Sequence, residues 1–170
     1  MSNIQKKSKA EISKDFRSVV VKLENNLKSI ADGKNIIAGT KKKPIVTDSK
    51  KIPIRHFFMD GIYVREMKMY KGTIVVGAIH KHLHMCFLLE GHLTVANEDG
   101  VIEHKAPCYI KSTPGIKRVL YAHEDSLWYN THKNPSNTKD IDQLEKEIVV
   151  LNYDEYEKYI NNKNNKLWHF

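Results

Sequence analysis

The segment Gly77–Gly91 reads GAIHKHLHMCFLLEG and carries histidines at three alternate positions. Successive side chains of an extended strand point to opposite faces, so His80, His82 and His84 share one face with Cys86. Several of the intervening positions carry large apolar side chains. The segment therefore predicts a β-strand with a row of imidazoles on one face.

Turn-forming residues divide the sequence around this segment into short apolar runs. They lie mostly about eight to twelve residues apart, a spacing typical of antiparallel sandwiches and barrels. The turn signals are Asp60-Gly61, Lys71-Gly72, Glu90-Gly91, Asp99-Gly100, Pro107 and Pro114-Gly115. We therefore predict a mainly β protein with flanking helices, in which residues 62–132 form an antiparallel jelly-roll barrel.

Helical patterns flank the predicted barrel on both sides. Residues 8–31 repeat apolar side chains every three or four positions, which predicts an amphipathic helix. Residues 140–149 and 154–160 predict two shorter helices near the other end. Three parts result: a basic helical arm and linker (1–51), a β-barrel (52–134) and a C-terminal helical segment with its tail (135–170).

The net charge of +8 over 170 residues is unevenly distributed. Residues 1–55 contain 14 Lys and Arg against 5 Asp and Glu, whereas residues 56–170 contain 14 against 15. A basic arm suits nucleic acid or an acidic partner surface, or simply keeps the chain soluble. Only four of the 28 basic residues are arginine, which weakens the nucleic-acid interpretation because phosphate and base recognition favours arginine.

Several classes of protein are not supported by the sequence. It contains no apolar stretch of about 20 residues and no secretory leader, so we expect a cytoplasmic protein without a membrane span. Its two cysteines, Cys86 and Cys108, are interpreted as reduced thiols, with Cys86 a buried thiol rather than a metal ligand. Phosphate-binding loops, dinucleotide fingerprints and nucleophile elbows are absent from the sequence.

The histidine row suggests a divalent-metal site. Neighbouring residues on one face of a strand lie about 6.6 Å apart, so two imidazoles can converge on one ion. A third ligand then comes from a bend or from another strand, and we assign His80, His82 and His84 to the metal, with His132 as the residue from a neighbouring strand. The alternatives are polar histidines without metal and, for His132, a hydrogen-bonded or ligand-binding residue at the rim. Imidazole suits zinc, iron, nickel and manganese alike.

Residues 62–132 resemble the cupin superfamily of jelly-roll proteins. When Gly91 is matched to the closing glycine of the first cupin motif, His84 takes the glutamate position and His80 the second-histidine position. Ala78 takes the first-histidine position, and Arg118 stands where the second motif has its histidine. The resemblance implies the barrel fold and a metal site whose usual ligand set is incomplete.

Within that superfamily, the chain resembles small cupin-like proteins encoded by tailed bacteriophages. The matching stretches, in order, are His80-Lys-x-x-His84, Glu98-Asp99-Gly100, Ala106-Pro107, Pro114-Gly115-x-Lys117-Arg118 and Tyr121-Ala-His-Glu-Asp125-x-x-Trp128-x-x-x-His132. This likeness implies an accessory protein of the host cytoplasm or of the virion, and it names no activity.

Arg118 raises the question of what neutralises a guanidinium inside a barrel. Either Glu90 or Glu124 forms an ion pair with it, or an acidic small-molecule ligand does. Tyr121 and Trp128 are candidates to line such a ligand pocket, and their alternative role is to fill the core.

Three functions follow from these features. The first is a binding or assembly module that forms a homo-oligomer or docks on virion neighbours through the helical arm and the tail residues Leu167, Trp168 and Phe170. The second is a metal-dependent cupin enzyme acting on a small molecule. The third is recognition of an acidic small molecule without metal.

Overall fold

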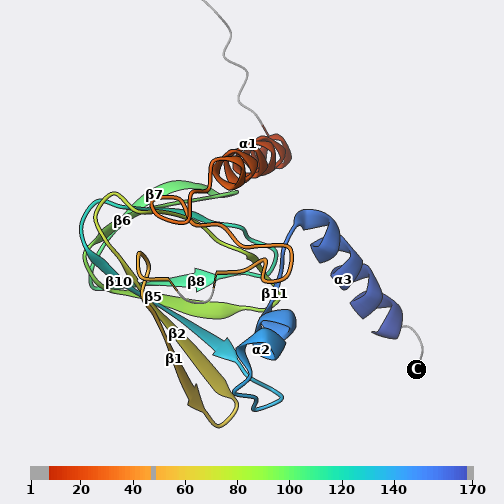
Figure 1. Cartoon of the computed structure of the whole chain (residues 1–170). Helices are drawn as coiled ribbons and strands as arrows, with labels where there is room; N and C mark the ends of the chain where they lie inside the picture. Colours follow the sequence, from red (N-terminus) through yellow and green to blue (C-terminus); the bar gives the residue numbers. More distant parts are fainter. Residues whose placement is uncertain (1–7, 47–48, 168–170) are drawn as a thin grey trace, which may run out of the picture.

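Two antiparallel sheets face each other at the centre of the molecule (Figure 1). The computed structural model describes residues 8–46 and 49–167. The described elements are α1 (Lys9–Ser29), β1 (Ile54–Met59), β2 (Ile62–Met69), β3 (Ile74–Val76), β4 (Ile79–His80), β5 (His84–Glu90), β6 (His92–Asn97), β7 (Gly100–Lys105), β8 (Cys108–Ser112), β9 (Val119–Ala122), β10 (Ser126–Lys133), α2 (Ile141–Ile148), β11 (Val149–Val150) and α3 (Tyr153–Leu167).

The strand order confirms the predicted cupin-like jelly roll. One sheet has the order β1-β2-β10-β5-β8 and the other β3-β9-β6-β7, while β4 pairs with β11 in a small third sheet. All these strand pairs are antiparallel. The strands begin with β1, which precedes residues 62–132 and lies within the predicted barrel part, 52–134.

The predicted turns connect these strands. The β6–β7 hairpin turns one residue earlier than the predicted Asp99-Gly100. Asn97 pairs with Gly100, so the loop consists of the two residues between them. Gly91 has a φ of 87°, and a Cβ there would lie 2.4 Å from the backbone oxygen of Asp125. Only glycine fits this left-handed turn against the neighbouring backbone.

The core fills the space between the two large sheets. Inward-facing side chains alternate with outward-facing ones along β5, β6 and β10, as expected for strands with one buried face. The buried members of this core are Met67, Met69, Cys86, Leu88, Leu93, Val95, Leu120, Ala122 and Trp128.

Helix α1 confirms the predicted amphipathic helix and packs onto its own barrel. Its first turn has a capping box formed by Ser8 and Glu11. Val20 is 1% exposed, and Lys117, which precedes β9, forms a 2.9 Å ion pair with Glu24. Part of the helix remains exposed; Val19, for example, is 63% exposed.

The C-terminal segment closes one end of the barrel (Figure 1). Helix α2 confirms the first predicted C-terminal helix, and α3 extends well beyond the predicted 154–160. Strand β11, which the sequence analysis missed, pairs Val149 with His80 and Val150 with Ile79. The tail residues Trp168 and Phe170 lie outside the described residues. Within the described part of the chain, no helix combines the length and the apolar character needed to cross a membrane.

Candidate metal centre

Three histidine rings meet where β4, β5 and β10 come together. The ring centroids of His80 and His84 are 4.2 Å apart, those of His84 and His132 are 4.4 Å apart, and those of His80 and His132 are 5.0 Å apart. One donor nitrogen from each ring lies within 4.8 Å of the others. Donors that share a tetrahedral ion at 2.0–2.1 Å lie about 3.4 Å apart, so a small closure of the rings suffices to hold one.

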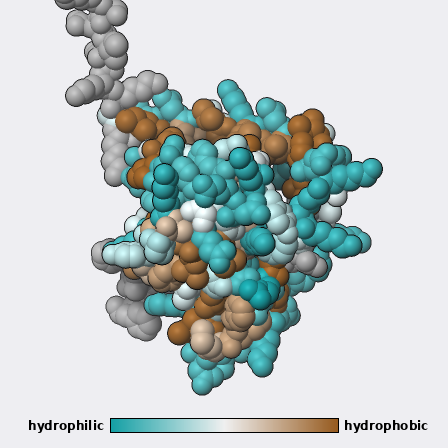
Figure 2. Space-filling model, turned by 90° about the vertical axis from the view of Figure 1, so that its left-hand side faces the viewer, coloured by the Kyte–Doolittle hydropathy of each residue, from teal (hydrophilic) through white to brown (hydrophobic). Residues whose placement is uncertain are grey.

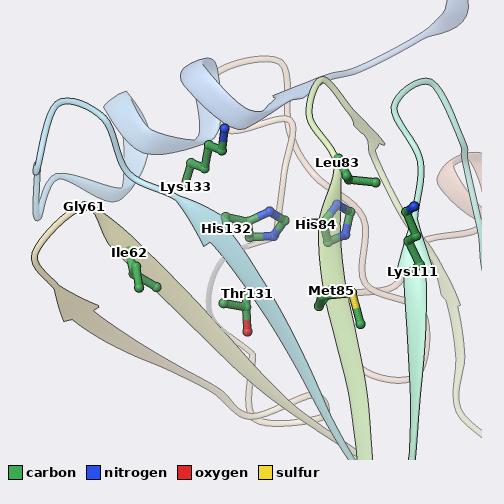
Figure 3. Close-up of a pocket in the computed structure, with 9 residues that line it drawn as sticks. All are labelled: Gly61, Ile62, Leu83, His84, Met85, Lys111, Thr131, His132 and Lys133. Carbon is green, nitrogen blue, oxygen red and sulfur yellow. The ribbon is translucent and has the colours of Figure 1, made fainter.

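The strand register explains why these three rings meet. Strand β5 begins at His84, and β10 pairs beside it with Thr131 opposite Met85, so His132 lies across from His84 (Figure 3). His80 ends β4, where its carbonyl oxygen accepts a hydrogen bond from the backbone N–H of Gly115 at 2.9 Å. Its pairing with Val149 of β11 adds a second tether.

His82 lies outside this cluster. Residues 81–83 form a bend between β4 and β5, so the strict alternation that placed three histidines on one face does not hold. The His82 ring donates instead to the carbonyl oxygen of Glu147 at 3.3 Å and lies edge-on to Tyr159. His82 therefore does not join the cluster, and the third ring comes from His132 instead.

The His84 ring presents an unpartnered nitrogen to the cluster. Its Nδ1–H donates to the carbonyl oxygen of His82 at 3.2 Å, which leaves Nε2 with its lone pair. Nε2 is buried and has no hydrogen-bond partner in the described structure. A buried acceptor without a partner is costly, and a metal ion is a group that it can bind.

All three rings are held neutral by their surroundings. Burial lowers the pKa of His84 to about 4, and the nearby guanidinium of Arg118 acts in the same direction. The pKa values of His80 and His132 lie well below their usual range. Burial is the main cause, and the neighbouring histidines lower these pKa values further. Neutral imidazole is the form that ligates metals, so at pH 7 no proton has to leave.

A polar network supports His132 from behind. The ring of Tyr63 stacks on His132 at 6.0 Å, and its hydroxyl accepts a hydrogen bond from Arg65 Nε at 3.1 Å. The guanidinium of Arg65 forms a buried ion pair with Glu145 of α2. The sequence analysis did not single out Tyr63 or Arg65. Tyr63 is the first buried residue of β2, and the alternation of this strand is the sequence signal that could have identified it.

Arg118 lies inside the barrel close to the histidines. It is 6% exposed and donates from Nη1 to the hydroxyl of Ser112 at 2.8 Å, while its buried Nε has no partner. Neither Glu90 nor Glu124 pairs with it, and no other carboxylate of the described residues does. The interpretation of Arg118 as half of a structural ion pair is therefore wrong.

Tyr121 and Trp128 lie on opposite sides of the barrel wall. Tyr121 points outward from β9, where it is 40% exposed and contacts the ring of His123 edge-on at 4.9 Å. Trp128 belongs to the core and donates from its indole nitrogen to Asn130 at 3.0 Å. Three residues of β10 lie between Trp128 and His132, so the Cα atoms of the two are about 13 Å apart.

A pocket of about 290 Å³ borders His84 and His132 (Figure 3). Its wall is largely apolar, with Ile62 and Met85 among its lining residues, and Lys111 and Lys133 also border it. A pocket of this volume has room for a small organic molecule.

The comparisons with known proteins add similarity of fold. No protein-family model matches the chain, and no curated protein sequence matches it either. Among solved structures, a cupin-2 domain protein from Shewanella frigidimarina is 16% identical over 51% of this chain and 85% of its own, with a TM-score of 0.43. A conserved protein of unknown function from Streptococcus pyogenes is 16% identical over 52% of this chain and 78% of its own, with a TM-score of 0.44.

An ectoine synthase from P. lautus is also similar. It is 18% identical over 64% of this chain and 75% of its own, with a TM-score of 0.45. At these identities the likeness concerns the fold and not the activity. The assignment of a cupin-like jelly roll rests on the strand order of the two sheets, and the donor set of the site rests on the three histidines themselves.

Proposed function

We propose that this protein binds a divalent transition-metal ion through His80, His84 and His132, and that Arg118 receives a small anionic ligand beside it. The observation that carries the proposal is the buried, unpartnered Nε2 of His84, which lies among two other neutral imidazoles. Three protein ligands leave a coordination position open for water or for a ligand. Zinc, iron, nickel and manganese all suit imidazole donors.

Arg118 supports the anionic character of the ligand. A buried guanidinium without a carboxylate is strongly disfavoured, and Ser112 satisfies only one of its five N–H donors. A carboxylate or phosphate group fits this fork of donors. Such a ligand suits either a binding module or the alternative of a metal-dependent enzyme that acts on a small acid.

Metal content tests the proposal. Untagged protein is stripped with a chelator and titrated separately with Zn²⁺, Ni²⁺, Fe²⁺ and Mn²⁺, alongside His84→Ala, His132→Ala and the matched control His82→Ala. We expect His84→Ala and His132→Ala to lose the high-affinity ion and His82→Ala to keep it. Wild-type protein that binds none of the four ions, or that keeps its ion after either cluster substitution, contradicts the proposal.

We also propose self-association as a second function, which suits a phage-type accessory protein that assembles with its own copies or with virion neighbours. Ile12 and Val19 are exposed on α1, Ile30 is exposed directly after it, and Val101 and Ile102 are exposed on β7. Hydrophobic side chains gather along the top of the molecule in Figure 2, at the height of α1 and β7 in Figure 1. Strand β7 is also a sheet edge in the described structure, paired only with β6. An apolar patch beside an open strand edge suits a second copy of this chain.

Sedimentation tests this second function without removing α1, which packs on its own barrel. The double variant Val19→Glu, Ile102→Glu places two carboxylates on the patch, and the control Asn25→Glu places one carboxylate elsewhere on α1. We expect the wild-type protein and Asn25→Glu to form dimers at micromolar concentration and the double variant to dissociate. A monomeric wild-type protein, or a double variant as dimeric as the control, overturns it.

A further inference from the structure

A second group of metal-binding side chains lies on the outer face of the four-stranded sheet, formed by His92, Glu103 and His123. One donor atom from each lies within 4.8 Å of the others. His92 starts β6, Glu103 belongs to β7, and His123 directly follows β9. The pairing of β6 with both neighbours therefore brings together three residues that are far apart in sequence.

The alternation of these strands shows that the group faces away from the barrel interior. Leu93 and Val95 of β6 are buried in the core, so the flanking His92 and Thr94 point outward. Glu103 lies directly opposite Thr94 and shares its face. The group is thus separated from the inner histidines by the thickness of the sheet and shares no residue with them.

Two of the donors already have the spacing of ligands on one ion. Nε2 of His92 lies 3.1 Å from a carboxylate oxygen of Glu103, close to the separation of about 3.4 Å between two ligands on a tetrahedral ion. The rings of His92 and His123 stack at 4.4 Å, and the backbone N–H of His123 donates to the carbonyl oxygen of His92 at 2.9 Å. The sheet therefore fixes the relative position of all three side chains.

Thr94 orients the third ligand. Its hydroxyl lies 2.6 Å from Nε2 of His123. When Nε2–H donates to this hydroxyl, Nδ1 keeps its lone pair and is the nitrogen available to a metal. A metal-binding histidine commonly fixes its tautomer by a hydrogen bond of this kind. Lys105 lies opposite His92 in the strand register, and its exposed, flexible ammonium group is free to extend into solvent.

We propose that His92, Glu103 and His123 form a second divalent-metal site, distinct from the inner histidine cluster, with Thr94 as its positioning residue. Two imidazoles and one carboxylate are a donor set that binds Zn²⁺, Ni²⁺ and Cu²⁺. The carboxylate supplies a negative charge that the inner cluster lacks. With three protein ligands and an open, solvent-facing side, the site keeps a position for water.

Zinc titration of the untagged, chelator-stripped protein tests this site. We expect two equivalents of Zn²⁺ for the wild-type protein and one for either Glu103→Gln or His123→Ala. The matched controls are Glu157→Gln, an exposed carboxylate on α3, and His82→Ala, a histidine outside both clusters, and both are expected to keep two equivalents. Circular dichroism of each variant verifies the fold.

The pattern of losses separates this proposal from the proposed function. His84→Ala removes the inner ion and leaves the outer one, whereas Glu103→Gln does the reverse. Thr94→Val is expected to weaken only the outer site, by roughly tenfold to a hundredfold. If Glu103→Gln and His123→Ala leave the zinc stoichiometry and affinity of the wild-type protein unchanged, His92 and Glu103 form an ordinary hydrogen-bonded contact and the second site is ruled out. This holds whether or not the inner site binds metal.

Discussion

The two histidine groups use the same chemistry in opposite surroundings. The inner group consists of three imidazoles, of which His84 and His132 are buried, and a buried arginine stands nearby. The outer group contains two imidazoles and a largely exposed carboxylate, whose side chain is 64% accessible. Burial keeps the inner rings neutral and leaves His84 Nε2 without a partner, whereas in the outer group Glu103 already provides His92 with one. A metal ion at the inner group would therefore provide His84 Nε2 with the partner it lacks. At the outer group an ion has to compete with the contact between His92 and Glu103 and with water.

The largest expected effect concerns the two aromatic residues that the sequence placed in one pocket. Trp128 fills the core and Tyr121 lies on the outer face. We expect Trp128→Ala to lower the free energy of unfolding by about 3–5 kcal/mol and Tyr121→Ala to change it by less than about 0.5 kcal/mol. Urea unfolding of both variants measures the difference. Equal losses of unfolding free energy in the two variants would show that Trp128 and Tyr121 are assigned to the wrong faces of their sheets.

Acid sensitivity is the next largest effect and belongs to the inner cluster. The pKa of His84 falls to about 4 on folding, whereas an unfolded histidine titrates near 6.5. The unfolded chain therefore binds more protons between these values, and stability falls as the pH drops from about 6.5 to 4, by about 3 kcal/mol for this residue. His80 and His132 act in the same direction.

Urea unfolding of metal-stripped protein from pH 7.5 to pH 4 measures this loss. His84→Gln removes the titrating ring and is expected to show a shallower dependence on pH than the wild-type protein. A wild-type stability that is flat across this range contradicts the burial of the cluster.

A smaller effect is expected for Arg118. Because no described carboxylate neutralises it, Arg118→Met removes an uncompensated buried charge, and the ligand-free protein is expected to keep or gain stability, by roughly 1 kcal/mol. The same substitution removes the fork of donors proposed for an anionic ligand. Thermal shifts with citrate, oxalate and phosphate compare the two proteins. A loss of several kcal/mol without ligand would indicate a structural partner for Arg118.

Much of the fold is predictable because its signals are local. Turn dipeptides, strand alternation and the stripe on residues 8–31 each depend on neighbouring positions, and these predicted the jelly roll and α1. Strand β11 has only two residues and forms through its pairing with β4, which no local pattern reveals.

The candidate site is only partly predictable for the same reason. His80 and His84 follow from their spacing, but the bend at residues 81–83 turns His82 away, and no nearby glycine or proline marks it. The choice between Tyr121 and Trp128 as core residues depends on which face of each strand meets the other sheet. His92 and His123 are 31 positions apart and meet only through the register of β6 with β9.

The metal content of the untagged, chelator-stripped protein after saturation with Zn²⁺ tests the central claim most directly. The account predicts that the wild-type protein and His82→Ala retain the inner ion, and that His84→Ala binds it more than about a hundredfold more weakly, because a direct ligand contributes more than a residue behind it. An inner ion that persists in His84→Ala, or that is lost in His82→Ala, would contradict the assignment of His80, His84 and His132 as the metal centre.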